Sequence, residues 1–153
     1  MSKEKREKKE KPRDKISEHF SKRDFACKCG VCEATIRIGL GLIGGLELLR
    51  TLAGQRITIK KGFVCPGSAE STSRHKKNYH TLGLAADITI DNKTLKEVVL
   101  LAEQVPEFKG IGLYPAEGYV HIDVRKEEKS YLWVWDGTRQ IELTDENRSR
   151  YLD

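Results

Sequence analysis

Two histidines and an aspartate have the residue types of a metal site. Asp87 stands in the middle of the mostly apolar segment 84–90, which has the composition of a buried strand. An ionised carboxylate in such a strand is costly unless it is paired, hydrogen-bonded or bound to a metal. His80 precedes this segment, and His121 occupies the middle of a second strand-like segment, 119–125. The sequence therefore predicts that Asp87 has a partner, and the two histidines are the candidates.

Strand geometry favours the convergence of these three side chains. Val120 and Ile122 flank His121 and point to the opposite face of a strand, so His121 would share a face with Asp87 if the two strands pair. Two imidazoles and one carboxylate leave a fourth metal position open to water, as in catalytic zinc sites. The alternative is a buried Asp–His hydrogen bond without a metal.

Three motifs follow one another along the chain: His80-Thr-Leu-Gly-Leu-Ala-Ala-Asp87-Ile, Gly110-Ile-Gly-Leu-Tyr114-Pro and Tyr119-Val-His121-Ile-Asp123-Val-Arg125. In this order they resemble the zinc D-alanyl-D-alanine peptidase family, whose relatives include bacteriophage murein endopeptidases and the hedgehog signalling domain. An earlier segment, Glu18 to Gly30, looks like the N-terminal motif of one branch of that family. The resemblance implies an α+β fold, a zinc ion held by His80, Asp87 and His121, and hydrolysis of bacterial cell-wall peptides.

Two carboxylates are candidates for the catalytic base. The resemblance places the base most commonly three residues before the last histidine, and that position is Gly118 here. Glu117 is one step further back, and Asp123 projects from the same strand face as His121. We rank Glu117 above Asp123, which is also a candidate for orienting an imidazole. The alternatives are an exposed loop glutamate and an Asp123–Arg125 ion pair.

The expected substrate-binding residues depart from the family pattern. Relatives end the preceding strand with Ser-Gly-Tyr-Arg, whereas this chain has Lys-Gly-Phe-Val64. Valine has no donor that could bind a carboxylate as the arginine fork does. Arg74 and Arg125 are the candidates to bind substrate instead. The pattern favours an endopeptidase over a D-Ala-D-Ala carboxypeptidase, and a non-catalytic zinc domain with a structural or binding role is the alternative.

Four cysteines form a second candidate site. Three of them are dense, and the fourth begins a Gly- and Ser-rich loop. The set suits a structural tetrahedral zinc, and two disulfides or four unlinked thiols are the alternatives. The residues are Cys27, Cys29, Cys32 and Cys65.

The basic charge lies mainly in the N-terminal tail. Residues 1–15 hold eight Lys or Arg and four Asp or Glu, so +4 of the net +5 is there. We expect residues 1–16 to be a disordered tail, with anionic polymer as a further possible partner, and 17–153 to be a monomeric zinc peptidase-like domain acting on peptidoglycan stem peptides. Neither a signal peptide nor a membrane span is expected. Release by phage lysis or carriage on a particle would then bring the protein to cell wall.

The remaining pattern predicts an α+β fold with a mainly antiparallel sheet flanked by helices. We expect a short capped turn from Ser21, and helices over 34–53 and from Asn92 to about Val105. Strands are expected over 56–63, 84–90, 110–114, 119–125 and 131–135.

Overall fold

The computed structural model describes residues 14–29, 37–65 and 78–153. Within these residues the chain forms one six-stranded mixed sheet with helices, an α+β fold. The strands are β1 (Ile57–Lys61), β2 (Ala85–Ile90), β3 (Gly110–Tyr114), β4 (Tyr119–Asp123), β5 (Tyr131–Trp135) and β6 (Gln140–Glu142). Their order across the sheet is β1-β2-β4-β3-β5-β6, and every neighbouring pair is antiparallel except β3 and β5. The prediction of a mainly antiparallel sheet is thus confirmed.

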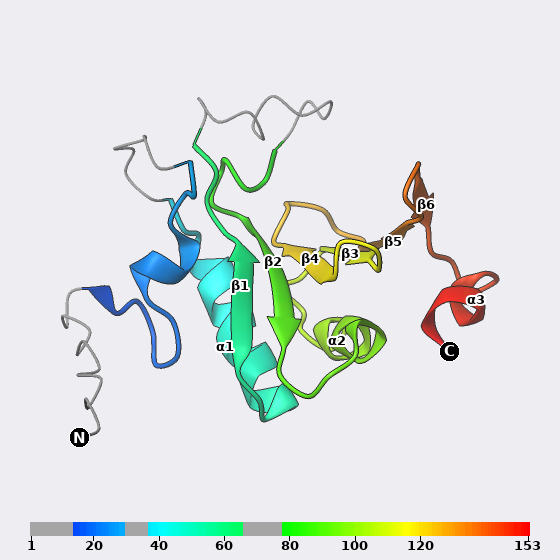
Figure 1. Ribbon diagram of the computed structural model, residues 1–153, viewed down its shortest axis with the longest axis horizontal. Coiled ribbons are helices and arrows are strands. Elements are labelled where there is room, and N and C mark those ends of the chain that lie inside the picture. Colours follow the sequence, from blue (N-terminus) through cyan, green and yellow to red (C-terminus); the bar gives the residue numbers. More distant parts are fainter. Residues whose placement is uncertain (1–13, 30–36, 66–77) are drawn as a thin grey trace, which may run out of the picture.

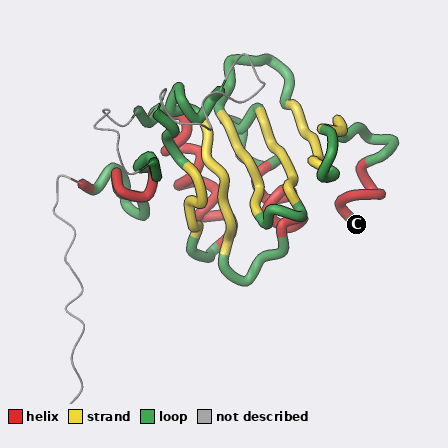
Figure 2. The backbone as a smooth tube through the Cα atoms, turned by 45° about the horizontal axis from the view of Figure 1, so that its top comes forward, coloured by secondary structure: helices red, strands yellow, loops and turns green. Residues whose placement is uncertain are grey.

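Two helices, α1 (Leu40–Ala53) and α2 (Leu95–Ala102), lie on the same face of the sheet (Figure 2). Helix α1 (Leu40–Ala53) ends at Gly54, whose φ of 63° is the left-handed conformation that favours glycine at a helix end. The helix begins at Leu40, later than expected, because the extended Gly39 is its N-cap. Apolar residues of both helices join the sheet residues Ile88, Val120 and Ile122 in the core.

The cap of helix α2 (Leu95–Ala102) corrects the expectation of an Asn92 cap. The hydroxyl of Thr94 accepts a hydrogen bond from the backbone N–H of Glu97 at 3.2 Å, so Thr94 is the N-cap. Asn92 instead has φ of 61° in the turn before the helix, a conformation that asparagine tolerates better than most residues.

The C-terminal elements were not predicted from the sequence. Strand β6 is only three residues long, and helix α3 (Arg148–Leu152) has five residues. A bidentate ion pair from Arg148 to Glu103 joins α3 to the end of α2, with distances of 2.6 and 2.9 Å. Figure 1 shows β6 and α3 at the end of the molecule opposite the N-terminal segment.

The N-terminal segment packs beside the end of β1. The carboxylate of Asp24 accepts the backbone N–H of Ser21 at 2.7 Å, as the capped turn predicted, and the following 3-10 turn η2 (Lys22–Phe25) buries Phe25. The carbonyl of Phe25 then accepts the N–H of Phe63 at 2.9 Å. This contact requires glycine at position 62, because a Cβ there would lie 2.6 Å from Cα of Phe25.

Residues 1–13 of the expected tail lie outside the described residues, and Ile16 at its end packs partly buried against the core. The division of the chain into tail and domain stays a prediction. No helix within the described ranges is long and apolar enough to span a membrane.

Candidate metal centre

The register between β2 and β4 brings Asp87 and His121 together. The two residues are paired opposite each other in the antiparallel ladder, as the strand pattern predicted, and Asp87 is 2% exposed. Oδ1 of Asp87 lies 2.9 Å from Nδ1 of His121 and 3.3 Å from Nε2 of His80. One ligand atom from each residue lies within 4.8 Å of the others. The three side chains therefore form one compact donor set.

His80 is held in the orientation that a metal ligand needs. Its Nδ1 donates a hydrogen bond to the carbonyl of Gly62 at 2.9 Å, because a carbonyl can only accept. Nε2 is therefore the ring nitrogen that points at Asp87, 3.3 Å from its Oδ1, and it is the nitrogen left for a metal when the ring is neutral. The side chain of Asn78 accepts the backbone N–H of His80 at 3.0 Å and so fixes the turn that carries His80.

His121 is held from its other side by a buried carboxylate. Its Nε2 lies 2.8 Å from Oδ2 of Asp123, which is fully buried. Arg125 donates to both oxygens of Asp123, from Nε at 2.8 Å and from a terminal guanidinium nitrogen at 2.7 Å. This arrangement, a carboxylate behind a ligating imidazole, is the usual support of a histidine metal ligand.

Two glycines in β3 make room for this layer of side chains. Gly110 pairs with Asp123 and Gly112 pairs with His121 across the β3–β4 ladder. A Cβ at Gly110 would overlap the carboxylate of Asp123, and one at Gly112 would overlap the indole of Trp133. The Gly-x-Gly spacing of β3 is therefore required for the side chains that support His121.

Aromatic residues that sequence reasoning missed form a wall beside the donor set. The ring of Trp133 lies 5.3 Å from that of His121, and its indole N–H donates to the hydroxyl of Tyr114 at 3.1 Å. The guanidinium of Arg125 lies 4.6 Å from the ring centre of Tyr79 and 5.8 Å from that of Tyr131. The sequence signal for Tyr114 was the Gly-Ile-Gly-Leu-Tyr-Pro motif that contains it, whereas no motif pointed to Trp133.

The pKa values follow from burial and from these contacts. Burial alone would lower the pKa of His121, but hydrogen bonds and charge from Asp123 and Asp87 raise it to about 9. Burial opposes ionisation of Asp87 and Asp123, yet their hydrogen bonds to histidine, and to Arg125 for Asp123, hold both pKa values well below the usual range. Without a metal, the site thus holds two carboxylates and a protonated His121.

The donor set fits zinc better than a hard cation. Two imidazole nitrogens and one carboxylate oxygen are ligands that zinc takes at about 2.0–2.2 Å, and three protein ligands leave a position open. Calcium and magnesium require oxygen ligands. Nε2 of His80, Oδ1 of Asp87 and Nδ1 of His121 are the atoms that would hold the ion, because the other imidazole nitrogens are engaged by Gly62 and Asp123.

The candidate base residues occupy different environments. Glu117 lies exposed in the turn between β3 and β4, whereas Asp123 is buried with both oxygens engaged. Burial raises the pKa of Tyr114, the hydrogen bond from Trp133 opposes this, and the charges of Asp87, Glu117 and Asp123 raise it further. The negative charges of Glu117 and of Asp87 in the donor set therefore both act on the Tyr114 phenol.

The substrate-binding candidates are only partly described. Arg125 lies beside the donor set with its guanidinium engaged by Asp123, and Arg74 lies outside the described residues. Val64, at the position of the family's arginine, is 3% exposed and presents no polar group. Lys61, which sequence reasoning missed, places Nζ 3.9 Å from Oδ2 of Asp87. Its register position opposite Asp87 in β1 and β2 accounts for this proximity.

The cysteines of the second candidate site also converge. Cys27, Cys29 and Cys65 offer sulfur atoms within 4.8 Å of one another. Cys32 lies outside the described residues.

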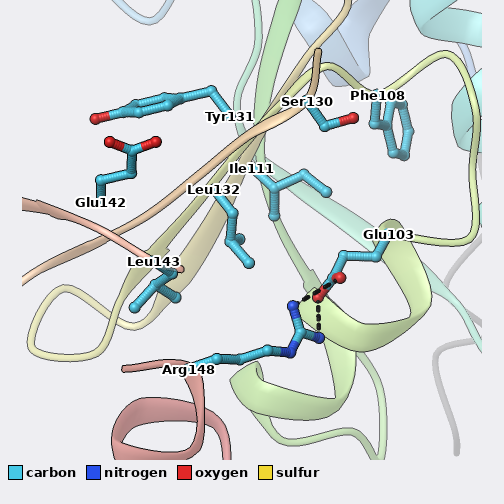
Figure 3. Close-up of a pocket in the computed structure, with 9 residues that line it drawn as sticks. All are labelled: Glu103, Phe108, Ile111, Ser130, Tyr131, Leu132, Glu142, Leu143 and Arg148. Carbon is cyan, nitrogen blue, oxygen red and sulfur yellow. Dashed lines mark hydrogen bonds and ion pairs between the residues drawn. The ribbon is translucent and has the colours of Figure 1, made fainter. Parts of the chain in front are cut away.

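A pocket of about 220 Å³ lies away from the donor set, and the Glu103–Arg148 ion pair forms part of its wall (Figure 3). Its residues Ile111 and Leu132 are paired in the β3–β5 ladder, one position out of phase with Gly112, and so face the helical side of the sheet. None of its lining residues belongs to the donor set, so we assign the chemistry to the opposite face.

A comparison with known protein families identifies the family of the chain. Residues 49–129, more than half of the chain, match the family described as peptidoglycan L,D-endopeptidase MepK. The matched range contains the whole donor set with Asp123 and Arg125. No individual curated protein and no solved structure matches the chain significantly. With the match spanning most of the sheet and every residue of the candidate metal centre, the chain belongs to the peptidoglycan L,D-endopeptidase family of zinc peptidases.

Proposed function

We propose that the protein is a zinc endopeptidase that cleaves peptide bonds in peptidoglycan stem peptides, at L,D bonds as the family description indicates. His80, Asp87 and His121 would hold the ion. Bound zinc supplies a Lewis acid that polarises a carbonyl and lowers the pKa of coordinated water towards 7.

The observation that carries this proposal is the orientation of both histidines. An ordinary buried Asp–His pair needs one hydrogen bond, whereas here each imidazole is fixed through its outer nitrogen and directs its inner nitrogen at one oxygen of Asp87. In metal sites a ligating histidine typically donates its outer ring N–H to a carbonyl or carboxylate, so that its inner nitrogen points at the metal position. Both histidines have this arrangement around one oxygen of Asp87. The family match covers residues 49–129, and this range includes all three residues.

We assign the proton-accepting role to Glu117 and a positioning role to Asp123. Both oxygens of Asp123 accept hydrogen bonds and its carboxylate is fully buried, so it has no free access to water in the site. Glu117 is exposed in the turn that precedes the strand of His121. A base must reach the proton that it abstracts, and an exposed turn carboxylate meets that requirement when substrate is bound.

Endopeptidase activity is favoured over carboxypeptidase activity by Val64. A carboxypeptidase must hold the terminal carboxylate of its substrate, usually through a guanidinium fork. Val64 is buried and apolar, and the guanidinium of Arg125 is already paired with Asp123. Lys61 places its ammonium group beside Asp87, 3.9 Å from Oδ2. This group would act on the substrate as a point charge, without the forked geometry of a guanidinium.

The test is digestion of defined cross-linked muropeptides. Zinc-loaded wild-type protein should cleave the L,D-linked dimer and release one new amino group per bond, while leaving the terminal D-Ala-D-Ala bond of a pentapeptide intact. Chelator, His121→Ala and Glu117→Gln should each abolish most of this cleavage. Glu127→Gln, an exposed carboxylate change after the same strand, is the matched control and should cleave as wild type does.

A non-catalytic zinc domain is the second candidate, and the observation that favours it is the loss of the arginine at Val64. It predicts stoichiometric zinc and binding of muropeptides without release of amino groups. Absence of cleavage by zinc-loaded protein across L,D- and D,D-linked dimers would establish this candidate and overturn the endopeptidase.

A further inference from the structure

We propose that Cys27, Cys29 and Cys65 bind a second metal ion, of the thiolate-binding class represented by zinc, at a structural site separate from the His80–Asp87–His121 centre. The three sulfur atoms come from two segments that are far apart in the sequence. The proposal rests on these three described residues.

The spacing of the sulfur atoms is that of ligands around one ion. Sγ of Cys29 and Sγ of Cys65 lie 3.8 Å apart. Zinc–sulfur bonds of about 2.3 Å at tetrahedral angles place two sulfurs about 3.8 Å apart, whereas a disulfide bond is about 2.05 Å long. All three sulfurs lie within 4.8 Å of one another, a spacing that suits ligands of a single ion.

The backbone around the cluster donates a hydrogen bond to one of its sulfur atoms. The N–H of Cys65 donates to the sulfur of Cys27 at 3.4 Å, and such donation stabilises a negative sulfur. Lys28, between the two N-terminal cysteines, is anchored through its Nζ to the carbonyl of Lys60 at 2.6 Å. This bond ties the segment between the two N-terminal cysteines to the end of β1.

The site would connect the N-terminal segment to the candidate metal centre. Cys65 follows directly after the stretch that contacts His80: the carbonyl of Gly62 fixes the imidazole, and the N–H of Val64 donates to the His80 carbonyl at 3.4 Å. Phe63 donates to the carbonyl of Phe25, two residues before Cys27. A metal on the cysteines would therefore hold the stretch from Gly62 to Val64, which orients His80, against the N-terminal segment.

The experiment removes the first centre so that the second is measured alone. The full-length His80→Ala/His121→Ala variant is purified under reducing conditions, stripped with chelator, reloaded with zinc and analysed for metal content and by X-ray absorption. We expect about one zinc per chain, with a first shell dominated by sulfur at about 2.3 Å rather than nitrogen or oxygen at about 2.0–2.1 Å. Adding Cys65→Ser should abolish stoichiometric retention, and adding Val64→Ala, a change at the neighbouring buried residue, should not.

A second readout guards against failure of a variant to fold. In the reloaded wild-type protein, zinc should slow alkylation of Cys27, Cys29 and Cys65 at least tenfold, as resolved by peptide mass spectrometry. Equal alkylation with and without zinc, a first shell without sulfur, or a Cys29–Cys65 disulfide in the reduced preparation would each overturn the proposal. None of these measurements uses peptidase activity, so the endopeptidase proposal stands or falls separately.

Discussion

Asp87 and His121 face each other across the β2–β4 ladder, with Oδ1 of the aspartate 2.9 Å from Nδ1 of the histidine. Because the pair is fixed by strand register, its geometry does not depend on loops. A slip of one residue would turn either side chain to the helical face. The sheet therefore holds Asp87 and His121 in place, and a turn carries the third candidate ligand, His80.

Asp87→Asn should abolish tight zinc binding at this centre. The amide keeps the shape of the side chain but removes the negative ligand, and the affinity for zinc should fall at least 100-fold. Competition with a chromogenic chelator measures the change in a Cys65→Ser background, so that only this centre is titrated. Asp91→Asn, an exposed aspartate just after the same strand, is the control and should bind zinc unchanged. Wild-type affinity in Asp87→Asn would exclude Asp87 as a ligand.

Asp123→Asn should weaken zinc binding without removing a ligand. Asp123 orients His121 and neutralises Arg125, and loss of such a supporting carboxylate typically costs about 10–100-fold in metal affinity or activity. The same competition assay measures the affinity, and the control is Asp145→Asn, which is exposed near the C-terminus. A complete loss of zinc with a folded protein would show a more direct role for Asp123 than positioning.

Gly110→Ala should destabilise the fold and disturb the site. The new methyl group would overlap the carboxylate of Asp123, and overpacking of this kind costs about 1–3 kcal/mol. Gly44→Ala is the matched control, because a Cβ there meets nothing within 4 Å and should stabilise α1 by about 1 kcal/mol. Urea unfolding measures both changes, and equal midpoints for Gly110→Ala and wild type would contradict the packing described.

The stability of the metal-free protein should decline in mild alkali. His121 has a pKa of about 9 in the fold against 6.5 when exposed, so its protonated form stabilises the fold fully below pH 6.5, and this contribution is lost as pH rises through 9. Thermal unfolding of chelator-treated protein should therefore show a Tm that falls between pH 6.5 and 9. In His121→Asn this part of the decline should be absent, and a Tm in wild type that rises over the same interval would contradict a raised pKa.

Asp87 and His121 were predictable because each produced a signal in the sequence, whereas the resemblance to the family singled out His80. A charged residue in an apolar strand, Asp87, required a partner, and the alternation around His121 placed that residue on the polar face. The turn from Ser21 was likewise marked by its capping pair with Asp24. Local patterns of this kind determine a face or a cap before the full fold is known.

Other features depend on contacts between distant segments and left no local signal. The approach of Trp133 to Gly112 follows from the parallel pairing of β3 and β5, which no spacing indicates. Helix α3 is short and depends on the ion pair between Arg148 and Glu103. The approach of Lys61 to Asp87 likewise required the register of β1 and β2.

The assignment of the metal ligands is tested most directly by anomalous diffraction at the zinc absorption edge from crystals of the zinc-loaded protein. We predict a peak about 2.0–2.2 Å from each of Nε2 of His80, Oδ1 of Asp87 and Nδ1 of His121, with Nε2 of His121 still bonded to Asp123. A zinc-loaded crystal without a peak at these three atoms, or with the ion bound at Nε2 of His121, would contradict it.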